Sequence, residues 1–378
     1  MNRGTIAVST TILLALGMVA CGENKDESGN KEITRVEVAD SPFRPDDLEK
    51  TIDNLVDALG SSSAAEMEVT VITKPLNSGY WEPVRVGANR AMGELELVGQ
   101  VEAPVVSEDD DSQEVVAGRQ SDLFKQRRED GYNGIAIAPM DDSLTEEINT
   151  AVDQDVVTVT LDSDLPDSAR QLYVGTNNRQ AGYTAGQTLA SLITESRGTV
   201  YCLGTADPSW VDGYERTAGA AEALEEAGFT AIMHTIGWGP ETIENDFTVL
   251  TEALESADPP VVGMVGMFSN AFRAAEVAEQ FGLEPGDIKI AAFDFEPDTL
   301  KYMENGYIQA THAQRQYYMG YLLPYAMYSI KVLGFDATTD ILKDQMIGPN
   351  KFDTGIDVVK ADQMDEFGDF LDSLGIGG

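Results

Sequence analysis

The sequence predicts an α/β protein with two lobes, each built around a mainly parallel sheet that is flanked by helices. Short, continuous apolar segments alternate along the chain with longer segments of helical spacing. Unbroken apolar strands between helices are typical of parallel sheets that are covered on both faces. The chain has 378 residues, more than one domain usually holds, so two sheets of about five strands fit it better than one large sheet.

The overall charge excludes several classes of partner. The chain has 25 Lys and Arg residues against 65 Asp and Glu residues, a formal net charge of −40. Such a surface repels phosphate backbones and anionic lipid headgroups, so we expect no nucleic-acid partner. We expect a neutral or cationic ligand rather than an anionic one. Because the acidic residues are spread along the chain, a purely solubilising role for the charge stays open.

Residues 1–20 have the pattern of an export signal. Arg3 is the only charged residue before Cys21, and an apolar and small-residue run covers 6–20. This run is shorter than the roughly 20 apolar residues that span a bilayer. A basic start, an apolar centre and small residues before a cleavage site describe a signal peptide.

Cys21 directly follows this signal. Together with the preceding Met18, Val19 and Ala20, it resembles a bacterial lipobox. The resemblance implies that Cys21 is lipidated, which would anchor the mature protein to a membrane surface. A plain signal peptide with a chance cysteine is the alternative. We expect residues 21–65 to form a polar tether and a short N-terminal helix, because residues 46–60 carry apolar side chains at helical spacing and end at a glycine.

The main body then alternates strand and helix. Helices are expected from about residue 82 and over about 179–194, with others after most of the later strands. The expected strands cover 69–73, 134–138, 156–161, 172–174, 199–203, 229–235, 261–265, 288–293 and 308–311. In parallel sheets of this kind ligands bind beyond the carboxyl ends of the strands. The loops that follow these strands are therefore the place where a site is expected.

Aromatic, acidic and amide residues gather in those loops. The chain has three tryptophans, and all of them fall in expected strand-to-helix loops, as do Tyr80 and Phe268; the tryptophans are Trp81, Trp210 and Trp238. Asp162, Asn177 and Asp294 lie at or just after strand ends. Aromatic faces stack on the C–H faces of a sugar ring, while carboxylates and amides hold its hydroxyls. That the loop tryptophans only cap the core is the alternative interpretation.

Catalytic and metal-binding patterns are missing from the sequence. The two histidines, His234 and His312, stand alone near strand ends and suit structural roles. There is no Cys/His cluster with metal spacing, no glycine-rich phosphate loop with lysine, and no nucleophile elbow. Cys202 lies in an apolar run and is expected to be a small core residue. We therefore expect a protein that is not an enzyme, with no catalytic residue, no metal and no cofactor.

Eight segments, taken in order, resemble the type I periplasmic sugar-binding proteins, the ribose-binding-like solute receptors of ABC importers. The resemblance extends over about 69–364 and is carried by residues 76–81, 134–143, 157–162, 174–178, 213–219, 291–294, 310–314 and 353–357. It implies two lobes joined by a hinge of crossover segments. The first lobe would comprise 66–175 plus about 315–340, and the second 176–314 plus about 341–378.

The resemblance also implies roles for individual residues. Tyr80 and Trp81 would stack on the sugar in the first lobe and Trp238 in the second, while Asp162, Asp294 and Gln314 would bind hydroxyls. Ser163 and Tyr214 stand where the family often has arginine, which leaves the identity of the sugar open. The full expected ligand-binding set is Asn77, Ser78, Tyr80, Trp81, Asp162, Ser163, Asn177, Trp210, Tyr214, Arg216, Trp238, Phe268, Asp294 and Gln314.

The function that the resemblance implies is that of a substrate-binding lipoprotein of an ABC-type sugar importer. A neutral monosaccharide would be captured between the lobes and delivered to a membrane permease. We expect a monomer, exported and lipid-anchored at the cell envelope, facing the periplasm or the outside of the cytoplasmic membrane. The alternative is a receptor of the same fold for a sensor kinase or chemoreceptor. A regulator of the lac-repressor type, which shares the fold, is disfavoured by the export signal and the negative charge.

Overall fold

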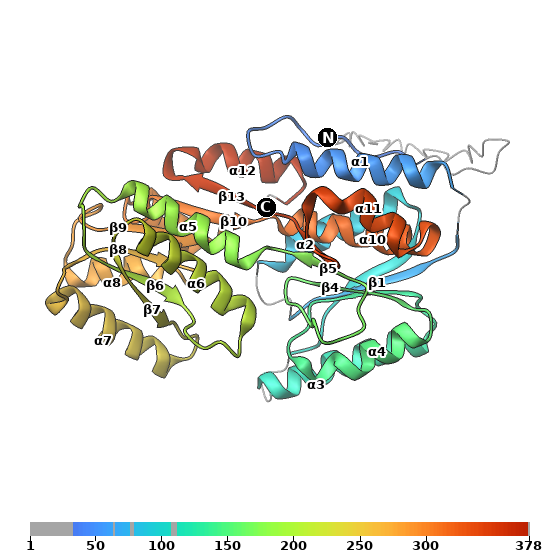
Figure 1. Ribbon diagram of the computed structural model, residues 1–378, viewed down its shortest axis with the longest axis horizontal. Coiled ribbons are helices and arrows are strands. Elements are labelled where there is room, and N and C mark those ends of the chain that lie inside the picture. The colour runs from blue at the N-terminus through green and yellow to red at the C-terminus, as the bar shows by residue number, and fades with distance from the viewer. Residues whose placement is uncertain (1–32, 63–64, 76–78, 107–111, 377–378) are drawn as a thin grey trace, which may run out of the picture.

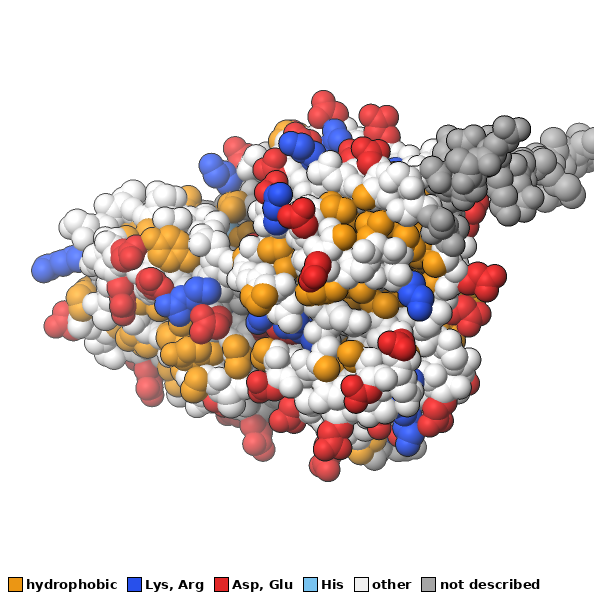
Figure 2. Space-filling model, turned by 45° about the vertical axis from the view of Figure 1, so that its right-hand side comes forward, with side chains coloured by type: hydrophobic (Ala, Val, Ile, Leu, Met, Phe, Trp, Pro, Cys, Tyr) orange, Lys and Arg blue, Asp and Glu red, His pale blue; other side chains and the backbone are white. Residues whose placement is uncertain are grey.

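The computed structural model describes residues 33–62, 65–75, 79–106 and 112–376, which form two lobes side by side (Figure 1). The expected signal peptide, Cys21 and the first part of the tether lie outside the described residues, as do Asn77 and Ser78. Within the described part, no helix is long and apolar enough to cross a membrane. Acidic side chains are scattered over both lobes on the face in Figure 2, rather than gathered in one patch.

The first lobe is built on a seven-stranded sheet with the order β11-β12-β5-β4-β3-β1-β2. Its neighbouring strands run parallel, except that β11 is antiparallel to β12. The strands are β1 (Glu68–Ile72), β2 (Val98–Glu102), β3 (Gly134–Ile137), β4 (Val157–Leu161), β5 (Leu172–Gly175), β11 (Met346–Gly348) and β12 (Lys351–Asp353). The helices around them are α2 (Trp81–Glu94), α3 (Gln113–Glu129), α4 (Thr145–Asp153), α10 (Gln316–Leu333) and α11 (Phe335–Leu342).

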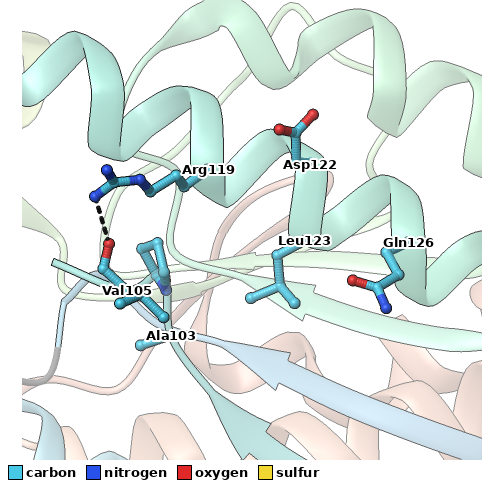
Figure 3. Close-up of a pocket in the computed structure, with 7 residues that line it drawn as sticks. Ala103, Val105, Arg119, Asp122, Leu123 and Gln126 are labelled. Atoms are coloured by element: carbon cyan, nitrogen blue, oxygen red, sulfur yellow. Dashed lines mark hydrogen bonds between the residues drawn. The ribbon is translucent and has the colours of Figure 1, made fainter. Parts of the chain in front are cut away.

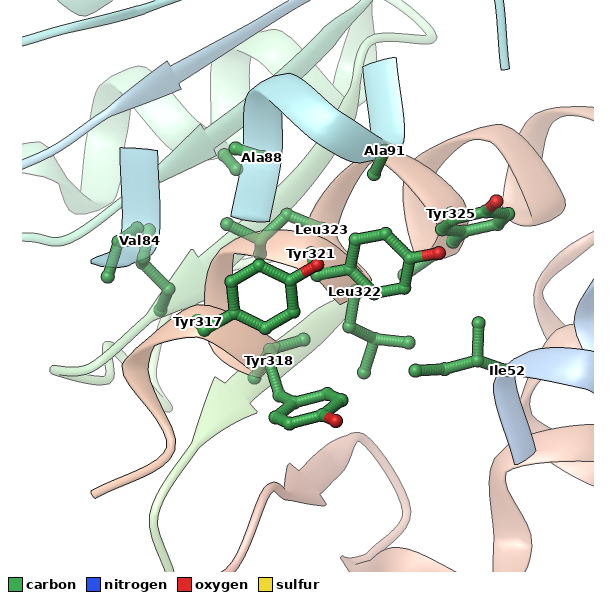
Figure 4. Close-up of a cluster of buried hydrophobic side chains, with 14 of the residues drawn as sticks. Ile52, Val84, Ala88, Ala91, Tyr317, Tyr318, Tyr321, Leu322, Leu323 and Tyr325 are labelled. Carbon is green, nitrogen blue, oxygen red and sulfur yellow. The ribbon is translucent and has the colours of Figure 1, made fainter. Parts of the chain in front are cut away.

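Apolar residues on both faces of this sheet explain why helices cover it on two sides. Val69 and Val71 of β1 belong to a large core cluster with α2 and α10, whereas Ile135 and Ile137 of β3 belong to a second cluster with α3 and α4. Alternate residues of a strand point to opposite faces, so each face needs its own helix layer. Figure 4 shows the first cluster, in which tyrosines of α10 lie between α2 and α1.

The second lobe has a six-stranded sheet with the order β13-β10-β9-β8-β6-β7, parallel except for β13. Its strands are β6 (Thr199–Gly204), β7 (Thr230–Thr235), β8 (Val261–Gly266), β9 (Lys289–Phe293), β10 (Ala310–Gln314) and β13 (Ile356–Lys360). Its helices are α5 (Asn178–Leu192), α6 (Val211–Glu226), α7 (Pro240–Ser256), α8 (Arg273–Phe281) and α9 (Pro297–Glu304). Cys202 is a fully buried residue of its core, as its sequence context predicts.

The expected α/β fold with two mainly parallel sheets is confirmed, and each expected strand is present. The sheets are larger than expected, because β2, β11, β12 and β13 add to them. β2 lies exposed at a sheet edge and has no unbroken apolar run, so its sequence did not identify it. The placement of 341–378 in the second lobe needs correction at one point. β12 pairs with β5 of the first sheet, and the chain changes lobe only between Asp353 and Ile356.

The N-terminal helix α1 (Asp46–Gly60) is confirmed and lies across the outer side of the first lobe, over α10 and α11 (Figure 1). Its buried face, including Leu48, Ile52 and Leu55, belongs to the core cluster of that lobe. The segment before it also docks, since Phe43 contacts Phe367 of α12 (Met364–Ser373) with ring centroids 4.9 Å apart. This extension is therefore an integral layer of the first lobe.

Three crossover segments join the lobes, after β5, β10 and β12. They are hydrogen-bonded to one another. The Thr176 hydroxyl donates to the Gln314 side-chain oxygen at 2.8 Å, and the Thr354 amide donates to the Gly175 carbonyl at 2.8 Å. Arg315 forms an ion pair with Asp357 at 2.8 Å. The three connections thus form one continuous hinge beside both sheets.

Candidate ligand-binding site

A cavity of about 260 Å³ lies between the lobes, at the carboxyl ends of both sets of parallel strands. A volume of this size is small for a ligand pocket and suits a small molecule. The first lobe contributes Lys74, Tyr80, Trp81, Asp162 and Ser163. The second lobe contributes Trp210, Asp212, Gly213, Arg216, Trp238, Phe268, Ser269, Asp294 and Gln314. The cavity therefore brings together ten of the residues expected from the sequence.

Two aspartates occupy corresponding positions in this cavity. Asp162 directly follows β4 and Asp294 directly follows β9. Both have left-handed backbone conformations, with φ of 60° and 65°. This region is uncommon for residues other than glycine, although Asp and Asn tolerate it better than most. The same local turn therefore ends a strand of each sheet and places a carboxylate in the shared cavity.

Asp162 is held by two partners from the first lobe. The Tyr80 hydroxyl donates to its Oδ1 at 2.6 Å, and the Lys74 ammonium lies 3.2 Å from its Oδ2. The same ammonium donates to the Ser163 hydroxyl at 2.6 Å. Burial and the nearby Asp162 carboxylate raise the pKa of Tyr80 well above its usual value, so its hydroxyl stays protonated and donates. The arrangement holds one carboxylate and one ammonium at the cavity wall.

Lys74 was not among the residues expected from the sequence, in which Arg216 is the nearest basic residue to the candidate loops. Lys74 lies two residues beyond the end of β1. The rule that identified Asp162 and Asp294, a polar residue at a strand end, would also have identified Lys74. Its charge partly balances Asp162 because the two side chains form an ion pair.

Asp294 belongs to a buried chain of hydrogen bonds in the second lobe. The Gln314 side-chain nitrogen donates to its Oδ1 at 3.2 Å, and Arg216 donates to the Gln314 side-chain oxygen at 3.1 Å. Burial raises the pKa of Asp294 to about 6, while the positive charge of Arg216 opposes the rise. These bonds determine the orientation of the Gln314 amide, because its oxygen accepts from Arg216 and its nitrogen donates to Asp294.

Arg216 is positioned by the close packing of α5 and α6. A Cβ on Gly182 of α5 would collide with the Arg216 backbone, so the helices approach closely only because glycine stands there. The guanidinium lies over the Phe293 ring at 4.6 Å and donates to the Asn178 side chain and the Met267 carbonyl, each at 2.9 Å. These contacts keep the buried cation rigid beside the cavity.

The aromatic residues around the cavity differ in burial. Trp81 is buried and contacts Tyr80 edge to face, with ring centroids 4.9 Å apart. Phe268 is also buried and stacks on Trp210 at 4.7 Å. Trp210 and Trp238 are exposed, so these two tryptophans do not cap the core. The interpretation that all loop tryptophans are core caps is therefore wrong for the second lobe.

Two expected residues do not line the cavity. Asn177 caps α5, where its side chain accepts from the Gln180 amide at 3.3 Å, and its own amide donates to Asp353 in the hinge. Tyr214 lies on α6 and is not among the lining residues, although its neighbour Gly213 is. Asn77 and Ser78 lie outside the described residues.

Asp212 is a lining residue outside the ligand-binding set expected from the sequence, as are Gly213 and Ser269. It lies in the first turn of α6, and its carboxylate accepts from the Asp164 amide of the opposite lobe at 3.4 Å. Burial and the Asp162 charge raise the pKa of Asp212. Asp164 itself points to other partners, since Arg170 and Lys351 pair with it at 2.5 Å and 2.8 Å. Nothing in the spacing of these residues predicts a contact between lobes.

The charges around the cavity are close to balanced. Three carboxylates, those of Asp162, Asp212 and Asp294, face two cations, Lys74 and Arg216. Within the described part of the chain, no group of three or more His, Cys, Asp or Glu side chains could hold a metal ion. The arrangement can hold a small neutral molecule that presents hydroxyl groups and an apolar face.

Both histidines have partners away from the cavity. His234 pairs with Asp246 at 3.0 Å. His312 is fully buried and contacts the Ala292 carbonyl at 2.9 Å. Burial lowers the pKa of His312 to about 4. Their environments agree with the structural roles expected from the sequence.

A second cavity, of about 230 Å³, lies at the edge of the first lobe between α3 and the segment after β2 (Figure 3). Arg119 lines one side of it and donates to the Val105 carbonyl at 2.9 Å. Its other lining side chains are mainly aliphatic, and no aromatic ring is among them. The cavity between the lobes is thus the stronger candidate, because it combines aromatic faces with buried polar groups.

Comparison with known proteins assigns the family. Residues 69–333 match the family described as "Periplasmic binding protein domain". A sugar ABC transporter protein (sugar-binding protein) from Bacillus halodurans is 26% identical, with 79% of this chain and 99% of that chain covered and a TM-score of 0.65. A solute binding protein of an ABC transporter from Burkholderia graminis C4D1M, solved in complex with D-arabinose, is also 26% identical, with 80% and 98% covered and a TM-score of 0.59.

A third similar structure shares the fold at lower identity. A periplasmic ribose ABC transporter protein from Conexibacter woesei DSM 14684 is 16% identical, with 82% of this chain and 96% of that chain covered and a TM-score of 0.68. A search among curated proteins returns no match. Because the family match covers most of the chain and the two-lobed architecture agrees with it, this chain belongs to the type I periplasmic sugar-binding protein family.

Proposed function

We propose that this protein is the substrate-binding component of an ABC-type sugar importer and captures a neutral sugar between its lobes. One observation carries the proposal: Asp162 and Asp294, one from each lobe, line a single cavity together with aromatic rings and a buried amide. A sugar ring needs acceptors for its hydroxyls, donors for its oxygens and apolar surfaces for its C–H faces. The cavity offers all three.

Each group has a definite task in this proposal. The Asp162 and Asp294 carboxylates accept hydrogen bonds from sugar hydroxyls, while Lys74 donates to sugar oxygens. Arg216 positions Gln314 and Asp294 through the hydrogen bonds described above. Trp81 and Phe268 provide the apolar walls. Hydrogen bonds to charged groups in a water-poor cavity are stronger than those between neutral groups, which gives affinity for an uncharged ligand.

Ligand binding favours closure of the lobes because the ligand contacts both of them. A ligand shifts an equilibrium between conformations only by its difference in affinity for them. Here one carboxylate belongs to each lobe, so a bound sugar is fully held only when the lobes approach. Asp212 and Asp164 already make a hydrogen bond between the lobes at 3.4 Å, which closure would shorten.

The net charge of the lining side chains favours a neutral ligand over an anionic one. Three carboxylates and two cations line the cavity, so an anionic ligand such as a sugar phosphate would meet net negative charge. The similar proteins support the same class, since one is a sugar-binding protein and another was solved with D-arabinose. The proposed ligand is therefore an uncharged sugar with at least one ring in the cavity.

We further propose that the protein is exported and anchored through lipidated Cys21, with the residues after Cys21 acting as a tether. Tethering keeps the receptor close to its membrane partner, at a high effective concentration. The proposed partner is the permease of the importer, which would accept the closed form. No step in this function makes or breaks a covalent bond in the ligand.

A thermal-shift screen over neutral pentoses and hexoses tests the proposal. A ligand present at 100 times its dissociation constant stabilises the folded state by about 2.7 kcal/mol. We expect at least one sugar to raise the melting temperature of the wild type and to raise that of Asp294→Ala by less. If no neutral sugar produces a shift while sugar phosphates or amino acids do, the proposed ligand class is wrong.

A further inference from the structure

The cavity changes character along the edge of the second sheet. The strands run in the order β10-β9-β8-β6-β7, away from the hinge. The lining residues at or after their ends fall into two groups. Gln314, Asp294 and Phe268 are 6%, 4% and 7% exposed, whereas Trp210 and Trp238 are 45% and 59% exposed. The end near the hinge is thus buried and polar, and the far end is open and aromatic.

The sheet edge along which these lining residues lie is longer than one sugar ring. Three strand intervals separate β9, which carries Asp294, from β7, which precedes Trp238. At about 4.8 Å per interval this is roughly 14 Å. A sugar ring with bonds of about 1.5 Å is roughly 6 Å across with its hydroxyl oxygens. A ring that is held by Asp294 and lies against Phe268 therefore leaves the outer end of the cavity unfilled.

Trp238 is exposed although its loop is firmly held. The Gly237 amide donates to Asp246 at 3.1 Å, and Arg273 donates to the Gly237 carbonyl at 2.7 Å. Asp246 is 1% exposed and also pairs with Arg273 and His234. A buried network of this kind restrains the backbone next to Trp238. The indole is thus presented to solvent from a fixed loop, at the mouth of the cavity.

Trp210 adds a second aromatic surface at the same end. It stacks on Phe268, with ring centroids 4.7 Å apart and an angle of 21° between the rings. Phe268 thus covers one face of Trp210, while nearly half of the residue remains exposed. The backbone amide of Ala206, in the Trp210 loop, donates to the Thr235 hydroxyl at 3.0 Å, which joins this loop to the end of β7. The two exposed tryptophans therefore belong to neighbouring, connected loops.

We propose that Trp210 and Trp238 form an outer subsite, which binds a second sugar ring joined by a glycosidic bond to the ring in the inner cavity. This inference rests on the proposed function and extends its ligand from a monosaccharide to a disaccharide. Stacking on indole faces holds a sugar ring through its C–H surface and needs no further charge. The outer end accordingly has aromatic surface, and the carboxylates and cations of the site lie further in.

The test compares one-ring and two-ring sugars by titration calorimetry. The probes are D-glucose with maltose and cellobiose, D-xylose with xylobiose, and D-galactose with lactose. We expect one disaccharide to bind at least tenfold more tightly than its matching monosaccharide. In Trp238→Ala this preference should fall at least tenfold, and in Trp238→Phe by less, since phenylalanine retains an aromatic face. Phe281→Ala removes an exposed aromatic side chain outside the cavity and should retain the preference.

Each outcome decides the matter. Tighter disaccharide binding that depends on Trp238 supports the outer subsite. Monosaccharide binding that no disaccharide surpasses overturns the subsite and leaves the proposed function intact. Equal weakening of both probes by Trp238→Ala also overturns it, because Trp238 would then act on the inner ring. If none of the probes binds to the wild type, the subsite is overturned, while the thermal-shift screen over neutral pentoses and hexoses decides the proposed function separately.

Discussion

Asp162 and Asp294 stand in matching positions beside the hinge of the two lobes. The Asp162 amide donates to the Val174 carbonyl of β5 at 3.3 Å, and the Asp294 amide donates to the His312 carbonyl of β10 at 2.9 Å. β5 and β10 are the strands after which the chain crosses to the other lobe. Residues other than glycine with positive φ carry some strain and tend to occur at functional sites. The paired turns thus tie the candidate ligand groups to the elements that would move on closure.

The first prediction concerns these two carboxylates. Loss of a hydrogen bond to a charged group typically costs about 1.5–3 kcal/mol, so Asp162→Ala and Asp294→Ala should each weaken sugar binding more than tenfold. Calorimetry with the sugar found by thermal shift measures the change. Asp340→Ala is the matched control, because Asp340 is an exposed residue of α11 and does not line the cavity. Wild-type affinity in both site variants would refute the assignment.

Sugar affinity should rise with pH through the range in which Asp294 ionises. Burial raises the pKa of Asp294 to about 6, and the ionised carboxylate is the stronger acceptor for a hydroxyl. The raised pKa affects the stability of the ligand-free protein in the opposite direction. Burying the ionised carboxylate costs free energy, so this stability falls as the pH rises through about 6. We therefore expect tighter binding at about pH 7 than at about pH 5, with proton release on binding.

Calorimetry in buffers of different ionisation enthalpy measures this proton release directly. Asp294→Asn keeps the shape of the side chain but cannot ionise, so it should show weaker binding and a smaller pH dependence. Tighter binding in acid than at neutral pH would contradict the assigned role of the Asp294 carboxylate.

Binding should be nearly independent of salt concentration. A neutral sugar displaces no counterions, and the charges of the site are paired or buried, so added salt screens little of the interaction. Titrations at low and high ionic strength provide the measurement. A steep fall in affinity with added salt would indicate a charged ligand and would argue against a neutral sugar.

The anchor can be tested separately from the binding site. Cys21→Ser removes the sulfur that the proposed lipid chains require, so the protein should move from the membrane fraction to the soluble fraction. Cys202→Ala changes the other cysteine, which is buried in the second lobe, and should remain with the membrane. Membrane retention of Cys21→Ser would show that Cys21 does not anchor the chain.

His312 should make the protein sensitive to acid. Burial lowers the pKa of His312 from 6.5 to about 4, so protonation opposes folding. Above about pH 6.5 His312 is neutral in both the folded and the unfolded state, so it costs no stability. As the pH falls towards 4, the unfolded state binds a proton that the folded state does not, and the free energy of unfolding falls by about 3 kcal/mol. Urea unfolding at several pH values measures it, and His312→Gln should lose less stability than the wild type over this range. An equal loss in both would assign the acid sensitivity to other groups.

The expectation that residues at or just after strand ends form the site identified most residues that line the cavity. It placed Asp162, Asp294 and the three tryptophans at the ends of strands, and the structure brings all of them to one cavity. Lys74 obeys the same rule, but the sequence reasoning did not extend it to a residue just beyond β1. Asp212 lies in the first turn of α6, where an acidic residue is ordinary for a helix N-terminus. Its role at the cavity appears only when the lobes face each other.

Asn177 is the reverse case, a residue that was expected to bind the ligand but does not line the cavity. An amide just after a strand suits a hydroxyl ligand, but it also suits a helix N-cap, and in the sequence the two patterns look the same. The structure assigns the side chain to the cap of α5 and the backbone amide to Asp353 of the hinge. That partner is 176 residues away, so no local pattern could indicate it.

The sequence by itself determined the α/β class, the order of the expected strands and the chemistry gathered at their ends. These features depend on the local alternation of apolar strands and helices, which is visible in a single chain. Only the tertiary structure decided that β12 belongs to the first sheet, that Lys74 pairs with Asp162, and that Trp238 stands at the open end of the cavity. The reason is that strand order and lobe packing join residues that are far apart in sequence. Their contacts depend on topology, which local periodicity does not encode.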